Sequence, residues 1–204
     1  MQKLQRISIE VRKDMSTTQD RHFNPSVMLF PLRRYMSRSQ YDFMSAHVKE
    51  GMAVLDLGSG PGFFTSKLSK LVGKKGEVYA VDGDEAAIER LRKRNLSLNI
   101  TNVRTYVSSA ASIPFVESES VDIVMSNGLL CCMVDHKGAV NEIARVMKPN
   151  AKGYISVSKM LRKDKLGVTK EEWNGILSSF DLIKKGSSAM MDWAIFSKSG
   201  ADEK

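Results

Sequence analysis

Short apolar runs alternate along the chain with longer stretches in which apolar residues recur every three or four positions. Four of the runs have the length and composition of buried strands, at residues 52–57, 78–81, 102–107 and 121–125. The stretch after the first run carries Phe64, Leu68, Leu71 and Val72, which lie at i, i+4, i+7 and i+8 on one face of a helix. Strands that alternate with amphipathic helices predict an α/β fold with a parallel sheet.

The second half of the chain continues this pattern. A further helical stripe is formed by Val140, Ile143, Ala144 and Met147 and stops at Lys148-Pro149. A fifth strand is predicted at 154–157. Thr169 and Glu172 then form a capping box at the start of another helix. The chain ends with two predicted strands, at 180–184 and 191–197.

A glycine-rich turn joins the first predicted strand to the first helix. Gly58, Gly60 and Gly62 fall between them, where the backbone can close on a ligand and the helix N-terminus offers N–H groups. Asp82 stands twenty positions after the last of these glycines, at the end of the second strand. A carboxylate there can accept both hydroxyl groups of a ribose, so the two features together predict a nucleoside site.

The glycine spacing and a second carboxylate narrow the choice of nucleoside. Dinucleotide folds use G-x-G-x-x-G, whereas this chain has G-x-G-x-G with Asp56 two residues ahead of Gly58. A carboxylate at that point repels a pyrophosphate and suits an ammonium group. The amino-acid end of S-adenosylmethionine carries such a group.

The segment 56–62 resembles motif I of the class I S-adenosylmethionine-dependent methyltransferases, and later segments match that family in order. Residues 108–115 look like its adenine loop, 126–128 follow its fourth strand, and 148–153 resemble its K-P-G-G turn. The resemblance implies a Rossmann-like α/β fold with a seven-stranded, mostly parallel sheet and helices on both faces. The implied strand order is 3-2-1-4-5-7-6, with the last strand antiparallel.

The same resemblance implies S-adenosyl-L-methionine as cofactor and S-adenosyl-L-homocysteine as product. The implied cofactor-binding residues are Asp56, Gly58, Ser59, Gly60, Pro61, Gly62, Phe63, Asp82, Gly83, Ser109, Ala110, Asn127 and Gly128. Ser109 stands where many relatives carry an adenine-binding Asp, so the contact to the adenine amino group is expected from a backbone carbonyl or the serine hydroxyl. Asn127 is expected to contact cofactor or substrate, because ligands of open α/β sheets bind outside the carboxyl ends of the strands.

No residue is assigned a catalytic role from the sequence. Methyl transfer is an in-line displacement, so holding the reactants collinear and excluding water supplies much of the rate. A general base is required only for a neutral hydroxyl or a protonated amine. The conceivable bases are His22, Tyr35, Asp135 and His136, each of which is also readily explained as a structural or solvated residue.

The chain divides into an N-terminal extension, 1–50, and a cofactor-binding core, 51–204. The resemblance implies that residues 27–36 form a lid over the site. Within this segment, Arg33, Arg34 and Tyr35 either bind an anionic or aromatic substrate or belong to a basic surface loop. A helix is predicted at 39–48.

The composition also limits the classes of protein to which the chain can belong. A chain of 204 residues that is 42% hydrophobic can bury one full core. It has no apolar run near the ~20 residues of a membrane span, and residues 1–21 lack the apolar region of a signal peptide, so a cytoplasmic location is expected. The two cysteines, Cys131 and Cys132, are expected to be reduced, either as buried small hydrophobes or facing a substrate or thiophilic metalloid. No zinc-ligand spacing is present.

The formal net charge of +8 is compatible with RNA, but the basic residues are spread over several elements. The leading hypothesis is therefore a small-molecule methyltransferase, similar to the enzymes of quinone biosynthesis. An RNA methyltransferase of the same fold and a non-catalytic S-adenosylmethionine-binding protein remain as alternatives.

Overall fold

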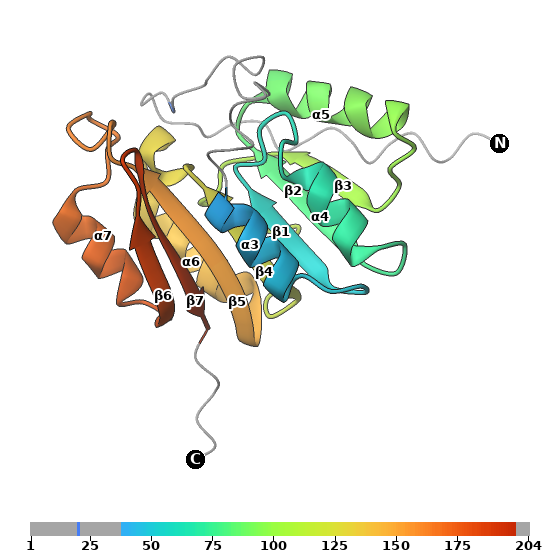
Figure 1. Cartoon of the computed structure of the whole chain (residues 1–204). Helices are drawn as coiled ribbons and strands as arrows, with labels where there is room; N and C mark the ends of the chain where they lie inside the picture. Colours follow the sequence, from blue (N-terminus) through green and yellow to red (C-terminus); the bar gives the residue numbers. More distant parts are fainter. Residues whose placement is uncertain (1–19, 21–37, 199–204) are drawn as a thin grey trace.

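Seven strands form one sheet in the order β3-β2-β1-β4-β5-β7-β6 (Figure 1). The computed structural model describes residue 20 and residues 38–198. The strands are β1 (Ala53–Leu57), β2 (Glu77–Asp82), β3 (Val103–Val107), β4 (Val121–Asn127), β5 (Met147–Ser158), β6 (Asp181–Ser187) and β7 (Met191–Ser197). The predicted strand order and the antiparallel last strand are confirmed, because β7 pairs antiparallel with both β5 and β6.

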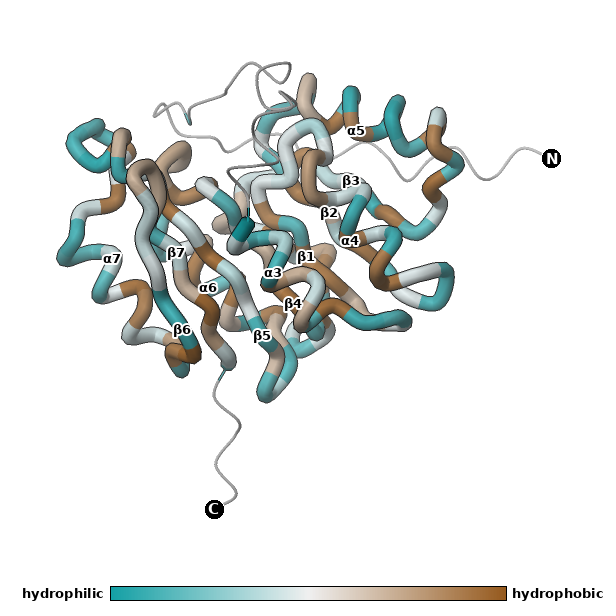
Figure 2. The backbone as a smooth tube through the Cα atoms, viewed as in Figure 1, coloured by the Kyte–Doolittle hydropathy of each residue, from teal (hydrophilic) through white to brown (hydrophobic). Residues whose placement is uncertain are grey.

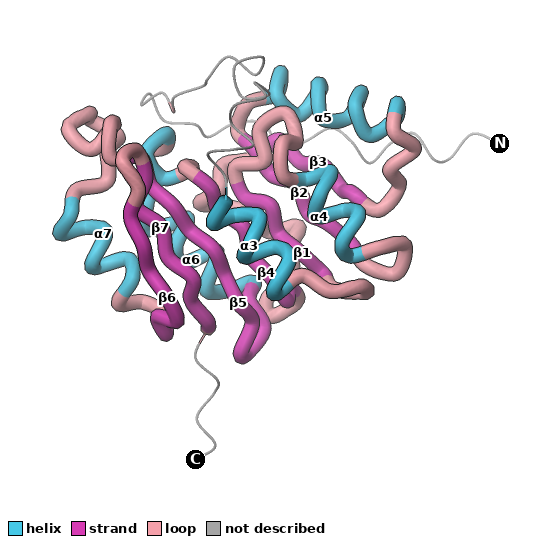
Figure 3. The backbone as a smooth tube through the Cα atoms, in the orientation of Figure 1, coloured by secondary structure: helices cyan, strands magenta, loops and turns pink. Residues whose placement is uncertain are grey.

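Helices cover both faces of the sheet (Figures 1 and 3). They are α3 (Arg38–His47), α4 (Thr65–Val72), α5 (Glu85–Ser97), the short 3-10 helix η1 (Leu130–Cys132), α6 (His136–Val146) and α7 (Lys170–Leu177). The helices α3, α4 and α5 lie on one face, and α6 and α7 lie on the other. The predicted lid at 27–36 and the candidate residues His22 and Tyr35 lie outside the described residues.

The central strands are buried on both faces, as parallel strands between helix layers must be. In β1, Val54 faces the α3 and α4 layer, whereas Leu55 and Leu57 belong to the larger cluster on the α6 and α7 side. In Figure 2, hydrophobic residues, in brown, lie along the central strands and recur along the helices α4 and α5. This double burial explains why β1 and β4 are mostly apolar, with Asp56 and Asp122 as interruptions.

The fifth strand starts earlier than predicted. Residues 148–153 were expected to form a turn, but β5 begins at Met147, which pairs with Val121. The next pair joins Lys152 to Ile123, so the ladder is irregular between these two points. Asn150 has φ +63° within this irregular stretch, and Asn tolerates that conformation better than other non-glycine residues.

The predicted N-cap at Thr169 marks the start of α7 correctly. Thr169 is the N-cap of α7, and its hydroxyl accepts the N–H of Glu172 at 3.1 Å. The Glu172 side chain contacts His136 of α6, so one half of the predicted capping box is formed. None of the described helices is long and apolar enough to cross a membrane.

Candidate functional site

The glycine turn leaves β1 at the carboxyl edge of the sheet and folds back on β2. The N–H groups of Gly58 and Ser59 both donate to the carbonyl of Val81, at 2.8 and 3.0 Å. Gly58 and Gly62 have φ of +79° and +87°. A side chain at Gly62 would also place its Cβ 2.4 Å from Leu91 Cδ1, and one at Gly58 would meet Leu129 at 3.0 Å. Glycine is therefore required here by backbone conformation and by close packing.

Asp82 lies directly against this turn. Its Oδ2 accepts the N–H of Gly60 at 2.8 Å, and its Oδ1 accepts the N–H of Asp84 at 2.9 Å. Asp84 in turn caps α5 by accepting the N–H groups of Ala86 and Ala87. The carboxylate predicted to bind a ribose is thus fixed by two backbone donors at the mouth of the glycine turn.

Asp56 is buried beneath the same turn, with 3% of its surface exposed. The hydroxyl of Thr65, the first residue of α4, donates to Asp56 Oδ2 at 2.6 Å. Burial raises the pKa of Asp56 to about 7; the Thr65 hydrogen bond opposes this shift and the nearby Asp82 charge adds to it. A cation that approached Asp56 would favour its charged form and lower that pKa.

Asn127 ends β4 and Gly128 follows it, beside the glycine turn. Asn127 Oδ1 accepts from Gln40 Nε2 of α3 at 2.6 Å and from Ser156 Oγ of β5 at 2.8 Å. The N–H of Gly128 donates to the Ser156 carbonyl at 3.0 Å, and Gly128 has φ +70°. The Asn127 amide is therefore held in one orientation by two elements that the sequence had not linked to it.

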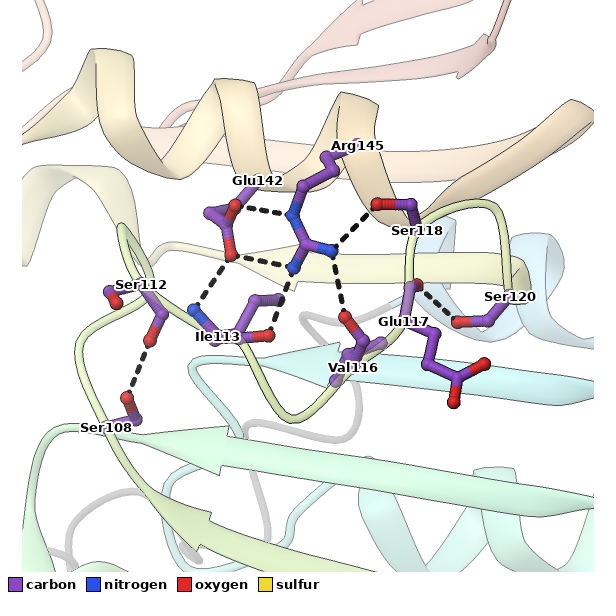
Figure 4. Close-up of polar contacts among 9 residues, drawn as sticks. All are labelled: Ser108, Ser112, Ile113, Val116, Glu117, Ser118, Ser120, Glu142 and Arg145. Carbon is purple, nitrogen blue, oxygen red and sulfur yellow. Dashed lines mark hydrogen bonds and ion pairs between the residues drawn. The ribbon is translucent and has the colours of Figure 1, made fainter. Parts of the chain in front are cut away.

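The predicted adenine loop, 108–115, is fastened to α6 (Figure 4). Glu142 Oε2 accepts the N–H of Ile113 at 2.8 Å. Arg145 donates to the carbonyls of Ile113 and Val116, at 3.0 and 2.9 Å, and also pairs with Glu142. Within the loop, Ser109 Oγ accepts the N–H of Ala111 at 3.3 Å. The loop is thus held by side chains about thirty residues further along the chain.

We expect Arg145→Leu to loosen this loop, because it removes the ion-pair partner of the half-buried Glu142 and two donors to the carbonyls of Ile113 and Val116. The free energy of unfolding should fall by about 1–3 kcal/mol, measured by urea denaturation. Arg38→Leu is the matched control, since Arg38 also pairs with an acid on its own helix, Asp42, at 3.9 Å on the exposed face of α3. Its loss should be below about 1 kcal/mol. Equal losses in the two variants would contradict the fastening of the loop by Arg145.

The remaining predicted site residues differ in their exposure to solvent. Pro61 is buried, Gly83 is exposed, and Ala110 is 6% exposed. Phe63 is half-buried and packs edge-on against the buried Phe64, with ring centroids 4.8 Å apart. The structure therefore gathers the turn, Asp82 and Asn127 at one edge of the sheet, while their roles in cofactor binding stay predictions.

Two of the conceivable bases lie in the described part of the chain. Asp135 is the N-cap of α6, where its Oδ1 accepts the N–H of Gly138 at 2.8 Å, so its role is structural. His136 Nδ1 lies 2.6 Å from Glu172 Oε1, and its Nε2 is buried with no hydrogen-bond partner among the described residues. This carboxylate and imidazole pair was missed in the sequence, because the two residues belong to different helices.

Residues 48–191 match the family model described as a methyltransferase domain. The ubiquinone/menaquinone biosynthesis C-methyltransferases UbiE of Shewanella sp. (strain ANA-3) and Shewanella baltica (strain OS155) are 33% and 34% identical over 130 and 127 residues. Each alignment covers 62% of this chain and 49% of the relative, so the chain spans about half the length of the curated relatives it matches.

Solved structures agree with the fold. The crystal structure of a SAM-dependent methyltransferase from Aquifex aeolicus superimposes with a TM-score of 0.75 at 26% identity. The match covers 87% of this chain and 100% of the Aquifex chain.

Proposed function

The chain belongs to the class I S-adenosylmethionine-dependent methyltransferases, and we propose that it transfers the methyl group of S-adenosylmethionine to a small molecule. The observation that carries the proposal is the bond between the glycine turn and Asp82. It brings the backbone N–H groups of a strand-to-helix turn and a ribose-binding carboxylate to one point.

The residues at this edge suit each part of the cofactor. Asp82 would accept the ribose hydroxyl groups, and the buried Asp56 would face the ammonium group of the methionine end. Ser59 Oγ is buried at the turn without a hydrogen-bond partner among the described residues, so it can donate to the methionine carboxylate. The loop around Ser109 and Ala110 would hold the adenine. A buried hydroxyl without a partner is costly in a native fold, which supports a ligand at this point.

The chain's own residues would act mainly by positioning. The bound cofactor supplies an electrophilic methyl group on its sulfonium. Asn127, fixed by Gln40 and Ser156, lies at the end of β4, where it would orient cofactor and acceptor. An orientation imposed from two elements reduces the freedom that must be lost before transfer. No general base is assigned, because His136 Nδ1 contacts Glu172 and its Nε2 is buried.

We infer a ring acceptor of the quinone-precursor type, because the curated relatives are named as ubiquinone/menaquinone C-methyltransferases. An RNA acceptor has weaker support. Several cations form ion pairs with acids, and these pairs are spread over the fold: Arg104 with Glu77, Arg145 with Glu142, Lys148 with Asp122 and Arg162 with Asp192. We place the protein in the cytoplasm, which suits two thiols that are not joined in a disulfide.

An acceptor comparison tests this function. S-adenosylhomocysteine formation would be measured with short-chain quinols and phenols, with an RNA transcript, and with no acceptor. We expect product with the ring compounds above the rate without acceptor. Turnover with RNA alone would overturn the acceptor class. Cofactor binding without turnover on any acceptor would indicate a non-catalytic binding protein.

A further inference from the structure

The two cysteines of the chain lie just beyond Gly128 and converge on its backbone carbonyl. Cys131 Sγ lies 3.1 Å and Cys132 Sγ 3.3 Å from the Gly128 oxygen. Consecutive residues of a helix normally point in different directions. Here the shared acceptor draws both thiols to one side, and their sulfur atoms are 3.9 Å apart.

This separation is too long for a disulfide, whose sulfur atoms are about 2.05 Å apart. It does match two thiolates bound to one soft atom. With sulfur bonds of about 2.3 Å, a separation of 3.9 Å corresponds to an angle of about 115° at that atom. This angle suits a tetrahedral centre; a pyramidal trivalent centre has narrower angles, so side-chain rotation would have to bring the two sulfur atoms slightly closer for both to bond to it.

The described residues do not supply the rest of such a site. A structural zinc ion takes four protein ligands. No group of three or more His, Cys, Asp or Glu residues is placed to bind a metal ion within residues 38–198. An occupant must therefore carry its remaining substituents itself and need only two thiolates. A trivalent organoarsenical fits this requirement, because it keeps one carbon substituent and exchanges its oxygens for soft sulfur ligands.

We propose that Cys131 and Cys132 form a capture site for trivalent organoarsenicals. Cys132 is half-buried and is the first thiol to react, and the buried Cys131 closes the chelate. Two arsenic–sulfur bonds form and the arsenic–oxygen bonds break. The two thiol protons leave with oxygen as water, and arsenic stays trivalent, so no oxidant or reductant is needed. The site lies three residues beyond Gly128, beside the edge of the sheet that carries the candidate cofactor site, and does not depend on the proposed activity.

The test uses phenylarsine oxide and the full chain. Intact-mass spectrometry of the folded protein should show one phenylarsenic group per chain. In this adduct, neither Cys131 nor Cys132 should still react with a thiol reagent. This adduct should survive an excess of a monothiol and be released by a dithiol. Because the second thiol reacts at high effective concentration, the wild type should bind at least about 100-fold more tightly than a single-thiol variant.

Cys131→Ser and Cys132→Ser are the matched variants, since a serine hydroxyl can still donate to the Gly128 carbonyl. Circular dichroism would verify that they fold. Either variant retaining the adduct as well as the wild type would overturn the proposal. A comparison of the wild type in buffer and in urea needs no variant. If phenylarsine oxide bound in urea and did not bind in buffer, the folded geometry would not form the site.

Discussion

Asp82→Ala should weaken S-adenosylhomocysteine binding by at least about 100-fold, because charge-assisted hydrogen bonds contribute about 1.5–3 kcal/mol each. The substitution removes the proposed ribose contacts and also the acceptor that holds the N–H of Gly60 at 2.8 Å. The ligand and the turn that cradles it are both affected. Asp82→Asn keeps the shape of the side chain and one carbonyl oxygen, so its loss should be smaller. Titration calorimetry of each variant measures the effect.

Asp122→Ala is the matched control for this prediction. Asp122 also accepts a strand N–H, from Ala53 at 2.9 Å, and it pairs with Lys148. It lies near the start of β4, at the opposite edge of the sheet from Asp82. We expect this variant to lose stability and keep its affinity for S-adenosylhomocysteine. Equal losses of affinity in the Asp82 and Asp122 variants would contradict a specific role for Asp82.

Asp56→Asn should remove a large pH dependence of stability. The pKa of Asp56 is raised to about 7 in the folded protein, chiefly by burial. The folded state therefore holds a proton that the unfolded chain has released, and stability is lost as the pH rises toward 7. Between pH 5 and pH 8 this loss amounts to roughly 2–3 kcal/mol. The asparagine side chain stays neutral, so urea denaturation of the variant should lack this component.

Two further measurements sharpen this prediction. Thr65→Val should shift the inflection to higher pH, because the Thr65 hydrogen bond lowers the pKa of Asp56. An ammonium group bound near Asp56 would favour the carboxylate, so cofactor binding near pH 6 should release protons and tighten as the pH rises. Calorimetry in buffers of different ionisation enthalpy detects that release. If the wild type and Asp56→Asn gave parallel profiles of stability and affinity, the assigned charge state would be wrong.

The features that local sequence carries were predicted well. The glycine turn, Asp82 at the end of β2 and the Thr169 cap each depend on a few neighbouring residues, and the structure confirms their conformations. The strand order followed from the family resemblance, since the positions of apolar runs do not reveal which strands are neighbours. The early start of β5 was missed, because Lys-Pro-Asn is typical of a turn and pairing with Val121 depends on a distant strand.

Contacts between distant segments are the features that the sequence does not predict. Gln40 lies 87 residues from Asn127, and nothing in an amphipathic helix marks one polar residue as the partner of a strand end. Glu142 and Arg145 similarly look like a solvated pair on α6 until the loop at 113–116 is brought against them. The apolar pattern therefore predicted the scaffold, whereas the positioning of the site arises from polar contacts that only the folded chain creates.

The most direct measurement is titration calorimetry of the wild-type chain with S-adenosylhomocysteine at neutral pH. The proposed site predicts binding of one ligand per chain with a dissociation constant near the micromolar range, equivalent to about 8 kcal/mol. Such binding would establish the cofactor site on which the proposed methyl transfer depends. Absence of binding by the folded wild-type protein would contradict it.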